Sequence, residues 1–203
     1  MKFLGSKTLE TERLILKAQT MDEQPYLWSV LMIPEVNRYY LTVPKKYAEK
    51  LKDWDKQEEY YKEDMKHAND SDEFRWSVFI KDTGKCIGRV SCHEASYEGY
   101  ETNDPSIRCV GWYIDPKYKG NGYGYEAAKA MMDYMFNECE IEEIKTGAAI
   151  QNPASWKIME KYGFEKQNYT KMVEYTYLDE PVEDYQYCLT KEMYLNRNNK
   201  TKK

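Results

Sequence analysis

Short runs of alternating apolar and polar residues recur along this chain, and apolar residues at helical spacing fill the stretches between them. The alternating and apolar runs predict strands at 13–17, 74–80, 85–94, 107–114, 143–150, 171–178 and 185–191. Helical spacing predicts helices at 23–32, 46–69 and 153–162. It predicts a further amphipathic helix that ends near Asn137, with an apolar face of Ala127, Ala130, Met131, Tyr134 and Met135. This order of elements predicts an α/β (α+β) fold, in which a mixed sheet carries helices on its faces.

Turn and capping residues set the ends of several elements. The segment Asp82-Thr83-Gly84 predicts a hairpin turn between two of the strands. We expect Asp22 to be the N-cap of the first helix, because a cap at Thr20 would place Pro25 where a backbone donor is needed.

The length of the chain, 203 residues, is usual for a single domain with one hydrophobic core. The sequence contains no internal repeat and no interior linker. We therefore expect one domain over residues 1–195. The segment 196–203 is polar and basic, and we expect it to be a disordered tail.

Composition excludes several classes of function. A net charge of −5 disfavours binding to nucleic acid, which requires a basic face. The N-terminus lacks the apolar core of a signal peptide, and no apolar run approaches the length of a membrane span. Five cysteines without a Cys-x-x-Cys pair are typical of reduced thiols, so we expect a cytoplasmic protein. With two histidines far apart, His67 and His93, we expect no metal site.

The stretch from Cys109 to Asn137 combines a strand, a glycine-rich turn and a helix. Glycines at 120, 122 and 124 let the backbone approach a ligand, and the following helix adds the positive end of its dipole. This combination favours a phosphate site. It is not a Walker A loop, because no Gly-Lys-Ser/Thr follows, and it lacks the glycine spacing of the Rossmann fingerprint. Taken alone, it is as typical of a surface turn.

A second block begins at Asn152, one helix and one strand further along the chain. Asn152 suits an N-cap, Pro153 the first helical position and Gly163 a left-handed helix end. Alone, this block indicates a capped helix in the core. The ordered pair of blocks is far more informative than either block by itself.

That pair resembles the GNAT family of acyl-CoA-dependent N-acetyltransferases, and most of all its branch of ribosomal-protein N-terminal acetyltransferases. The resemblance covers nearly the whole chain. The matching segments are LETERLILKAQTMDEQPYLWSVL, IGRVSCHE, VGWYIDPKYKGNGYGYEA, the block from Asn152 to Phe164, and DYQYCLTKEMY. It implies the GNAT fold, a mixed, mostly antiparallel sheet of about six to seven strands flanked by helices on both faces.

The resemblance also implies acetyl-CoA as co-substrate and identifies residues that would bind it. Backbone groups of Trp112, Tyr113 and Ile114 would pair with the pantetheine arm. Asn152 and Ser155 would lie beside the thiol end. The pyrophosphate would lie against Lys119, Gly120, Asn121, Gly122, Tyr123 and Gly124.

The resemblance says less about the catalytic residues. In this family the amine attacks the thioester directly, so the site must deprotonate an ammonium and protonate a thiolate. Ser155 is the candidate partner of the leaving sulfur, or else a helix-start serine that bonds only backbone. Many members place a general-acid tyrosine seven residues after the asparagine, where this chain has Met159, and Tyr162 is not assigned that role. Glu94 is the candidate base or water relay, or else a solvated strand end, and ordered water alone is a further route for the proton.

We therefore expect an enzyme that transfers an acetyl group from acetyl-CoA to a primary amine, either a protein N-terminus or a small molecule. The alternative is a non-catalytic acyl-CoA-binding or sensing module, favoured by Met159 and by the absence of a carboxylate on the strand 107–114. We expect a monomer or homodimer whose partners are acetyl-CoA and the amine acceptor, with no nucleic acid and no membrane.

Overall fold

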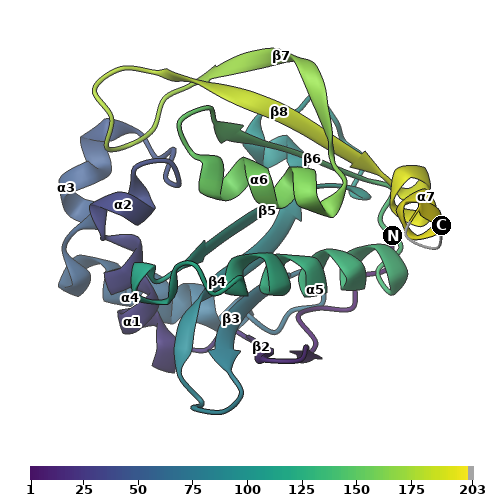
Figure 1. Cartoon of the computed structure of the whole chain (residues 1–203). Coiled ribbons are helices and arrows are strands. Elements are labelled where there is room, and N and C mark those ends of the chain that lie inside the picture. Colours follow the sequence, from purple (N-terminus) through teal and green to yellow (C-terminus); the bar gives the residue numbers. More distant parts are fainter. Residues whose placement is uncertain (201–203) are drawn as a thin grey trace.

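The computed structural model describes residues 1–200, with side chains as far as Arg197. In this part of the chain one sheet has the strand order β1-β2-β3-β4-β5-β6-β8-β7 (Figure 1). Neighbouring strands are antiparallel except β5 and β6, which are parallel. The strands are β1 (Leu9–Glu10), β2 (Leu14–Ala18), β3 (Arg75–Ile80), β4 (Cys86–Glu94), β5 (Ile107–Ile114), β6 (Glu143–Ala149), β7 (Glu165–Val173) and β8 (Val182–Thr190). The predicted mixed, mostly antiparallel sheet is confirmed, with eight strands in place of six to seven.

Helices flank the sheet (Figure 1). The helices are α1 (Gln24–Leu31), α2 (Pro34–Asn37), α3 (Ala48–Leu51), α4 (Trp54–Asp64), α5 (Tyr123–Asn137), α6 (Pro153–Tyr162) and α7 (Lys191–Lys200). Short 3-10 turns lie at Met21–Glu23, Lys45–Tyr47, Met65–His67, Ala95–Glu98 and Pro116–Tyr118. Among the described residues, no helix has both the length and the apolar character that crossing a bilayer requires.

Two apolar cores lie on opposite faces of β5, because successive residues of a strand point to opposite sides. Trp112 and Ile114 pack against the larger core, which contains the fully buried Met131 and Met135 of α5. Tyr113, between them, packs with α1 in a smaller core. The predicted apolar face of the helix after the glycine loop is thereby confirmed.

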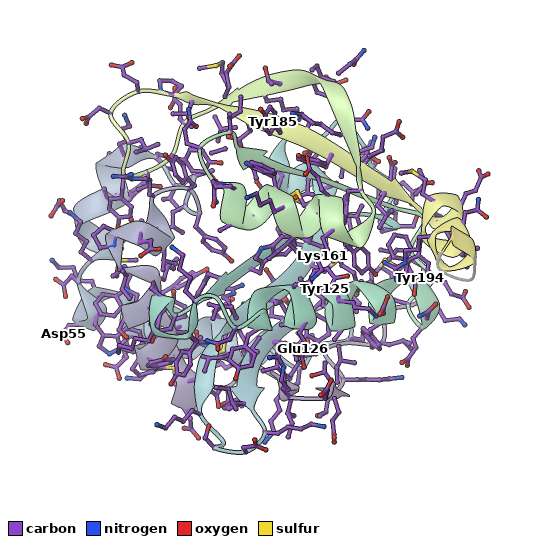
Figure 2. All side chains as sticks on the ribbon, viewed as in Figure 1. Asp55, Tyr125, Glu126, Lys161, Tyr185 and Tyr194 are labelled. Carbon is purple, nitrogen blue, oxygen red and sulfur yellow. The ribbon has the colours of Figure 1, made fainter. Side chains whose placement is uncertain are left out.

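α5 and α6 lie next to each other, and their surface contact includes a cation–π pair. The ammonium of Lys161 on α6 sits 4.1 Å from the ring centroid of Tyr125 on α5 (Figure 2). This contact helps to hold the two helices, whose N-termini both lie at the site described below, in a fixed relation.

The N-cap expected at Asp22 is wrong. Thr20 caps the turn Met21–Glu23, and it forms a capping box with Glu23. A 3-10 turn stands between this cap and α1, so Pro25 falls in the first turn of α1, where a missing backbone donor costs nothing.

The single helix expected over 46–69 is also wrong, because Asp53 is extended, with φ −97° and ψ 104°. The break frees the carbonyl of Leu51 to accept a hydrogen bond from the indole of Trp28 at 2.9 Å. Trp54 then packs on Trp28 with ring centroids 5.4 Å apart. The charged segment therefore folds as separate short helices.

Two further expectations near the C-terminus are corrected. The strand expected at 171–178 is β7, which begins at Glu165 and ends at Val173, because the chain then leaves the sheet and the Thr176 N–H donates to the carbonyl of Leu41 (2.8 Å). Asn196 and Arg197, expected in the tail, belong to α7, where the Arg197 guanidinium donates to Asp133 at 2.5 Å. Residues 201–203 of the expected tail lie outside the described residues.

Candidate active site

A cleft of about 1310 Å³ opens where β5 and β6 diverge. The two strands pair only at their starts, Ile107 with Glu143 and Arg108 with Ile144. On their outer edges, β5 stays paired with β4 and β6 stays paired with β8 along their lengths. The backbone edges of 109–114 and 145–149 that face each other therefore have no strand partner, and an extended ligand can pair with them.

The glycine loop ends at Gly122, which has a left-handed conformation with φ +80° and ψ 2° and lies at the N-cap of α5. No side chain caps this helix, and its first internal hydrogen bond runs from the Glu126 N–H to the Gly122 carbonyl at 3.1 Å. The N–H groups of residues 123–125 precede that bond and have no acceptor within the helix. Residues 122–125 all line the cleft, so these donors and the helix dipole suit a phosphate group.

Arg13, which the sequence analysis missed, braces this loop. Its Nη1 donates to the Asn121 carbonyl at 2.9 Å, and its Nε donates to Glu126 at 2.7 Å. Its guanidinium also lies 4.7 Å from the ring centroid of Tyr123. Burial raises the pKa of Glu126, but hydrogen bonds from Thr11 and Arg13 outweigh it and hold that pKa below its usual value. Glu126 is therefore an ionised anchor for the loop.

The other residues expected at the pyrophosphate do not all line the cleft. Gly120 and Lys119 line the cleft, and the ammonium of Lys119 pairs with Glu35 of α2. Asn121 does not line the cleft. Its amide donates to the carbonyls of Tyr118 (3.0 Å) and Lys119 (3.3 Å), so its side chain shapes the loop.

Trp112, Tyr113 and Ile114, which the resemblance assigns to the pantetheine arm, line the cleft. The hydroxyl of Tyr113 is already occupied, because it donates to the Leu27 carbonyl at 3.1 Å. What this segment offers a ligand is its unpaired backbone edge.

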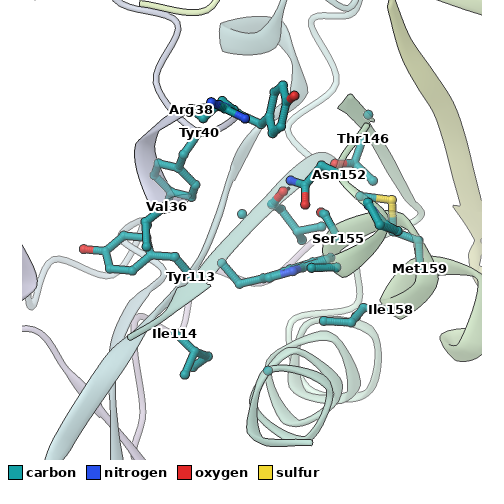
Figure 3. A pocket seen from close by; sticks show the side chains of 18 of the residues that line it. Val36, Arg38, Tyr40, Tyr113, Ile114, Thr146, Asn152, Ser155, Ile158 and Met159 are labelled. Atoms are coloured by element: carbon teal, nitrogen blue, oxygen red, sulfur yellow. Dashed lines mark hydrogen bonds between the residues drawn. The ribbon is translucent and has the colours of Figure 1, made fainter. Parts of the chain in front are cut away.

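Asn152 and Ser155 bring the start of α6 to the same cleft. Figure 3 shows their side chains near one another on one wall, with Tyr40 on the opposite wall. Asn152 occupies the N-cap position, but its side chain makes no capping bond. The backbone N–H of Ser155 donates to the Asn152 carbonyl at 3.1 Å, while its hydroxyl makes no hydrogen bond to any described residue. Both polar side chains are therefore available to a ligand. Asn152 is the N-cap residue, as predicted, but it caps the helix without a side-chain hydrogen bond.

A family model described as "Acetyltransferase (GNAT) domain" matches residues 13–165. This chain belongs to the GNAT family of acetyl-CoA-dependent N-acetyltransferases. The unpaired strand edge fits the pantetheine arm of acetyl-CoA, the co-substrate of this family, and the free N–H groups at α5 fit its pyrophosphate.

This chain is similar to several curated relatives, over different fractions of their length. The chain is 28% identical to "Uncharacterized N-acetyltransferase YnaD" of Bacillus subtilis (strain 168) over 97 residues, 48% of this chain and 53% of YnaD. It is 27% identical to "Probable N-acetyltransferase YjcK" of the same organism over 96 residues, 47% of this chain and 50% of YjcK. The chain thus spans about half the length of these two relatives. With "Uncharacterized protein YkkB", also of B. subtilis, it shares 26% identity over 172 residues, 84% of this chain and 91% of YkkB.

Solved structures share the GNAT fold. An acetyltransferase (GNAT family) from Bacillus anthracis has a TM-score of 0.72 at 20% identity, over 92% of this chain and 99% of that one. A ribosomal-protein-S5-alanine acetyltransferase from Vibrio fischeri has a TM-score of 0.71 at 17% identity, over 93% and 99%. A spermidine N-acetyltransferase from Vibrio cholerae, in complex with CoA and spermine, has a TM-score of 0.70 at 20% identity, over 92% and 100%. At these identities the likeness shows the fold.

Met159 occupies the position where many GNAT members have a general-acid tyrosine. Its side chain is buried against the cleft, with 1% of its surface exposed. Tyr162 does not replace that tyrosine, because its hydroxyl donates to Asp133 at 2.8 Å on the side of α5 and it does not line the cleft. This GNAT chain therefore presents no tyrosine from α6 to the cleft.

Glu94, the candidate base, lies outside the cleft. It lines a smaller cavity of about 550 Å³ and accepts a hydrogen bond from the Ser96 hydroxyl at 3.4 Å. His93, one residue earlier, does line the cleft and lies 3.1 Å from a carboxylate oxygen of Glu98. Glu94 is not positioned to accept a proton from an amine in the cleft.

The sequence analysis also missed the other end of the cleft, here called the tyrosine chamber. It is lined by Tyr39, Tyr40, Tyr100, Tyr175, Lys171, Asp184 and Gln186. The Tyr175 hydroxyl donates to Asp184 at 2.7 Å, and the Tyr100 hydroxyl donates to Gln186 at 2.8 Å. Burial raises the pKa of Asp184 to about 6, although the bond from Tyr175 lowers it.

Proposed function

We propose that this protein transfers an acetyl group from acetyl-CoA to a primary amine by direct attack of the amine on the thioester. The observation that carries the proposal is the continuity of the cleft. The glycine loop, the gap between β5 and β6, and the tyrosine chamber line one cavity. Such a cavity can hold both reactants in line, which removes most of the entropic cost of their meeting.

Each wall of the cleft has a separate task in this proposal. Bound acetyl-CoA supplies the thioester carbonyl that the amine attacks. The N–H groups at the start of α5 hold its pyrophosphate, and the unpaired edge of β5 holds its pantetheine arm. The free Ser155 hydroxyl lies at the start of α6 and gives its proton to the departing sulfur.

Two classes of acceptor are open within this function: a protein N-terminus and a small-molecule amine such as a polyamine. Proteins whose names state each activity, from V. fischeri and V. cholerae, share this fold. The tyrosines and the buried carboxylate of the chamber suit a cationic amine of either class. The five cysteines are all free, which supports a cytoplasmic location, where thiols stay reduced.

The test combines purified protein, acetyl-CoA and a panel of amines, with released CoA thiol as the signal. The panel holds spermidine and hexapeptides that begin with serine or alanine. We expect at least one amine to raise thiol release above the rate of hydrolysis. If none does while CoA still binds, the protein is a non-catalytic acyl-CoA-binding module, the alternative that the buried Met159 favours.

A further inference from the structure

Asp184 is a buried carboxylate with one oxygen that nothing in the described chain satisfies. Only 5% of its surface is exposed. One oxygen accepts from Tyr175 at 2.7 Å, and the other, Oδ1, is inaccessible to solvent and has no hydrogen-bond partner among the described residues. A buried, unpaired carboxylate oxygen is costly, so its presence in the wall of a cleft points to a cationic ligand.

The backbone of Asp184 lies beside the end of β6, just before the turn that leads to α6. Asp184 pairs with Ala149, the last residue of β6. The preceding residue, Glu183, accepts a hydrogen bond from the Ile150 N–H at 3.0 Å and so holds the turn that leads to Asn152. Asp184 and Ser155 line the same cleft.

The rings around Asp184 suit an ammonium group. The face of a tyrosine ring attracts a cation. The ammonium of Lys171 already sits 3.8 Å from the ring centroid of Tyr100, within the chamber. Lys171 lies opposite Asp184 in the pairing of β7 with β8, yet it leaves Oδ1 of the carboxylate unpaired. The rings of Tyr39 and Tyr175 meet edge to face, with centroids 5.7 Å apart.

We propose that Asp184 binds the ammonium group of the acceptor and takes the proton that must leave before the amine can attack. This inference rests on the proposed acetyl transfer. The ammonium proton passes to the carboxylate, giving a neutral amine and a carboxylic acid. The nitrogen lone pair then forms the bond to the thioester carbonyl carbon as the carbon–sulfur bond breaks. Ser155 gives its hydroxyl proton to the thiolate and is reprotonated by the second nitrogen proton. The products are the acetylated amine and the CoA thiol, after which Asp184 releases its proton to water.

The charge state of Asp184 fits this task near neutral pH. With a pKa raised by burial to about 6, the carboxylate is ionised at pH 7 yet basic enough to accept a proton. The charged and titratable groups around it are Lys171 of β7, the hydroxyls of Tyr100 and Tyr175, and the pair of His93 with Glu98.

The test compares Asp184→Asn with Tyr175→Phe, using whichever acceptor of the amine panel the wild type acetylates. Asp184→Asn removes the charge, whereas Tyr175→Phe removes only the hydrogen bond between the two side chains. We expect Asp184→Asn to lower kcat/KM for the amine by about 100-fold or more and to abolish the acidic limb of its pH profile. In Tyr175→Phe we expect that limb to move to higher pH, because the Tyr175 hydrogen bond lowers the pKa of Asp184 and its removal raises that pKa. CoA affinity should be unchanged in both variants.

Two outcomes overturn the inference while leaving acetyl transfer intact. One is a wild-type kcat/KM and acidic limb in Asp184→Asn, and the other is an equal loss in both variants, which would make Asp184 a support for Tyr175. A wild type that binds CoA but acetylates no amine would instead contradict the proposed function.

A measurement on the wild type covers the case in which Asp184→Asn does not fold. Propyltrimethylammonium should inhibit competitively against the amine, and its inhibition constant should rise about tenfold or more between pH 7.5 and 5 as the carboxylate protonates. A constant that stays level over this range would show that Asp184 does not bind the ammonium.

Discussion

Replacement of Gly122 by alanine tests whether the left-handed loop residue is part of the CoA site. An alanine held at φ +80° is less stable than glycine by about 1–2 kcal/mol, because its Cβ disfavours the left-handed conformation. Its Cβ would meet no closer atom than Nη2 of Arg13, at 3.5 Å, which is an ordinary contact. The backbone conformation is thus the whole perturbation, with no steric clash added.

Gly122 is exposed, so in the CoA-free protein we expect the loop to relax and relieve this strain. Binding must then restore the left-handed conformation, and the dissociation constant for CoA should rise by about 5- to 30-fold. Isothermal titration with CoA measures this change, and urea unfolding without CoA should show little loss of stability.

Gly84→Ala is the matched control. Gly84 has a similar conformation, φ +65°, with no atom within 4 Å of an added Cβ, but it lies in the turn between β3 and β4 and does not line the cleft. The Gly84→Ala variant should be less stable than the wild type and should keep its CoA affinity. If the dissociation constant of Gly122→Ala for CoA is also within about twofold of the wild-type value, the conformation of Gly122 plays no part in binding the phosphates.

Two further substitutions test the leaving-group step and the support behind the site. Ser155→Ala should lower kcat by about tenfold or more while CoA affinity stays at the wild-type value, as steady-state rates and titration will show; an unchanged kcat would remove Ser155 from the chemistry. Asp133→Asn should lower the free energy of unfolding at pH 7 by about 1–3 kcal/mol, because Asp133 accepts hydrogen bonds from Tyr162 and Arg197 that join α5 to α6 and α7. Burial raises the pKa of Asp133, but bonds from Lys129 and Tyr162 hold it below its usual value. Its stabilisation is therefore present above the unfolded-state pKa and lost as pH falls through the lower folded-state pKa, so urea unfolding of the variant should show a smaller loss of stability between pH 7 and 3. An equal loss in both proteins would contradict this origin of the effect.

The sequence determined the local pieces of this protein. The glycine loop before α5, the helix end at Gly163 and the alternation along β5 depend on turn chemistry and periodicity within a few residues, and such signals can be read directly from the chain. The resemblance then identified the GNAT family and its co-substrate. Where a local rule had two solutions, as with Thr20 and Asp22, the sequence could not choose, because the 3-10 turn that accommodates both Thr20 and Pro25 leaves no separate signal.

Only the tertiary structure decided which side chains share the cleft. Arg13 reaches the loop at Asn121 from more than a hundred residues away. Asp184 accepts a hydrogen bond from Tyr175 and lies beside Ala149 through the pairing of β8 with β6. Glu94 was predicted near the reaction because it ends a strand, but it does not line the cleft. Contacts of this kind depend on strand order and register, which arise from the packing of the whole sheet. For that reason the sequence predicted the residues we propose for co-substrate binding, while the carboxylate we propose to face the amine emerged only from the fold.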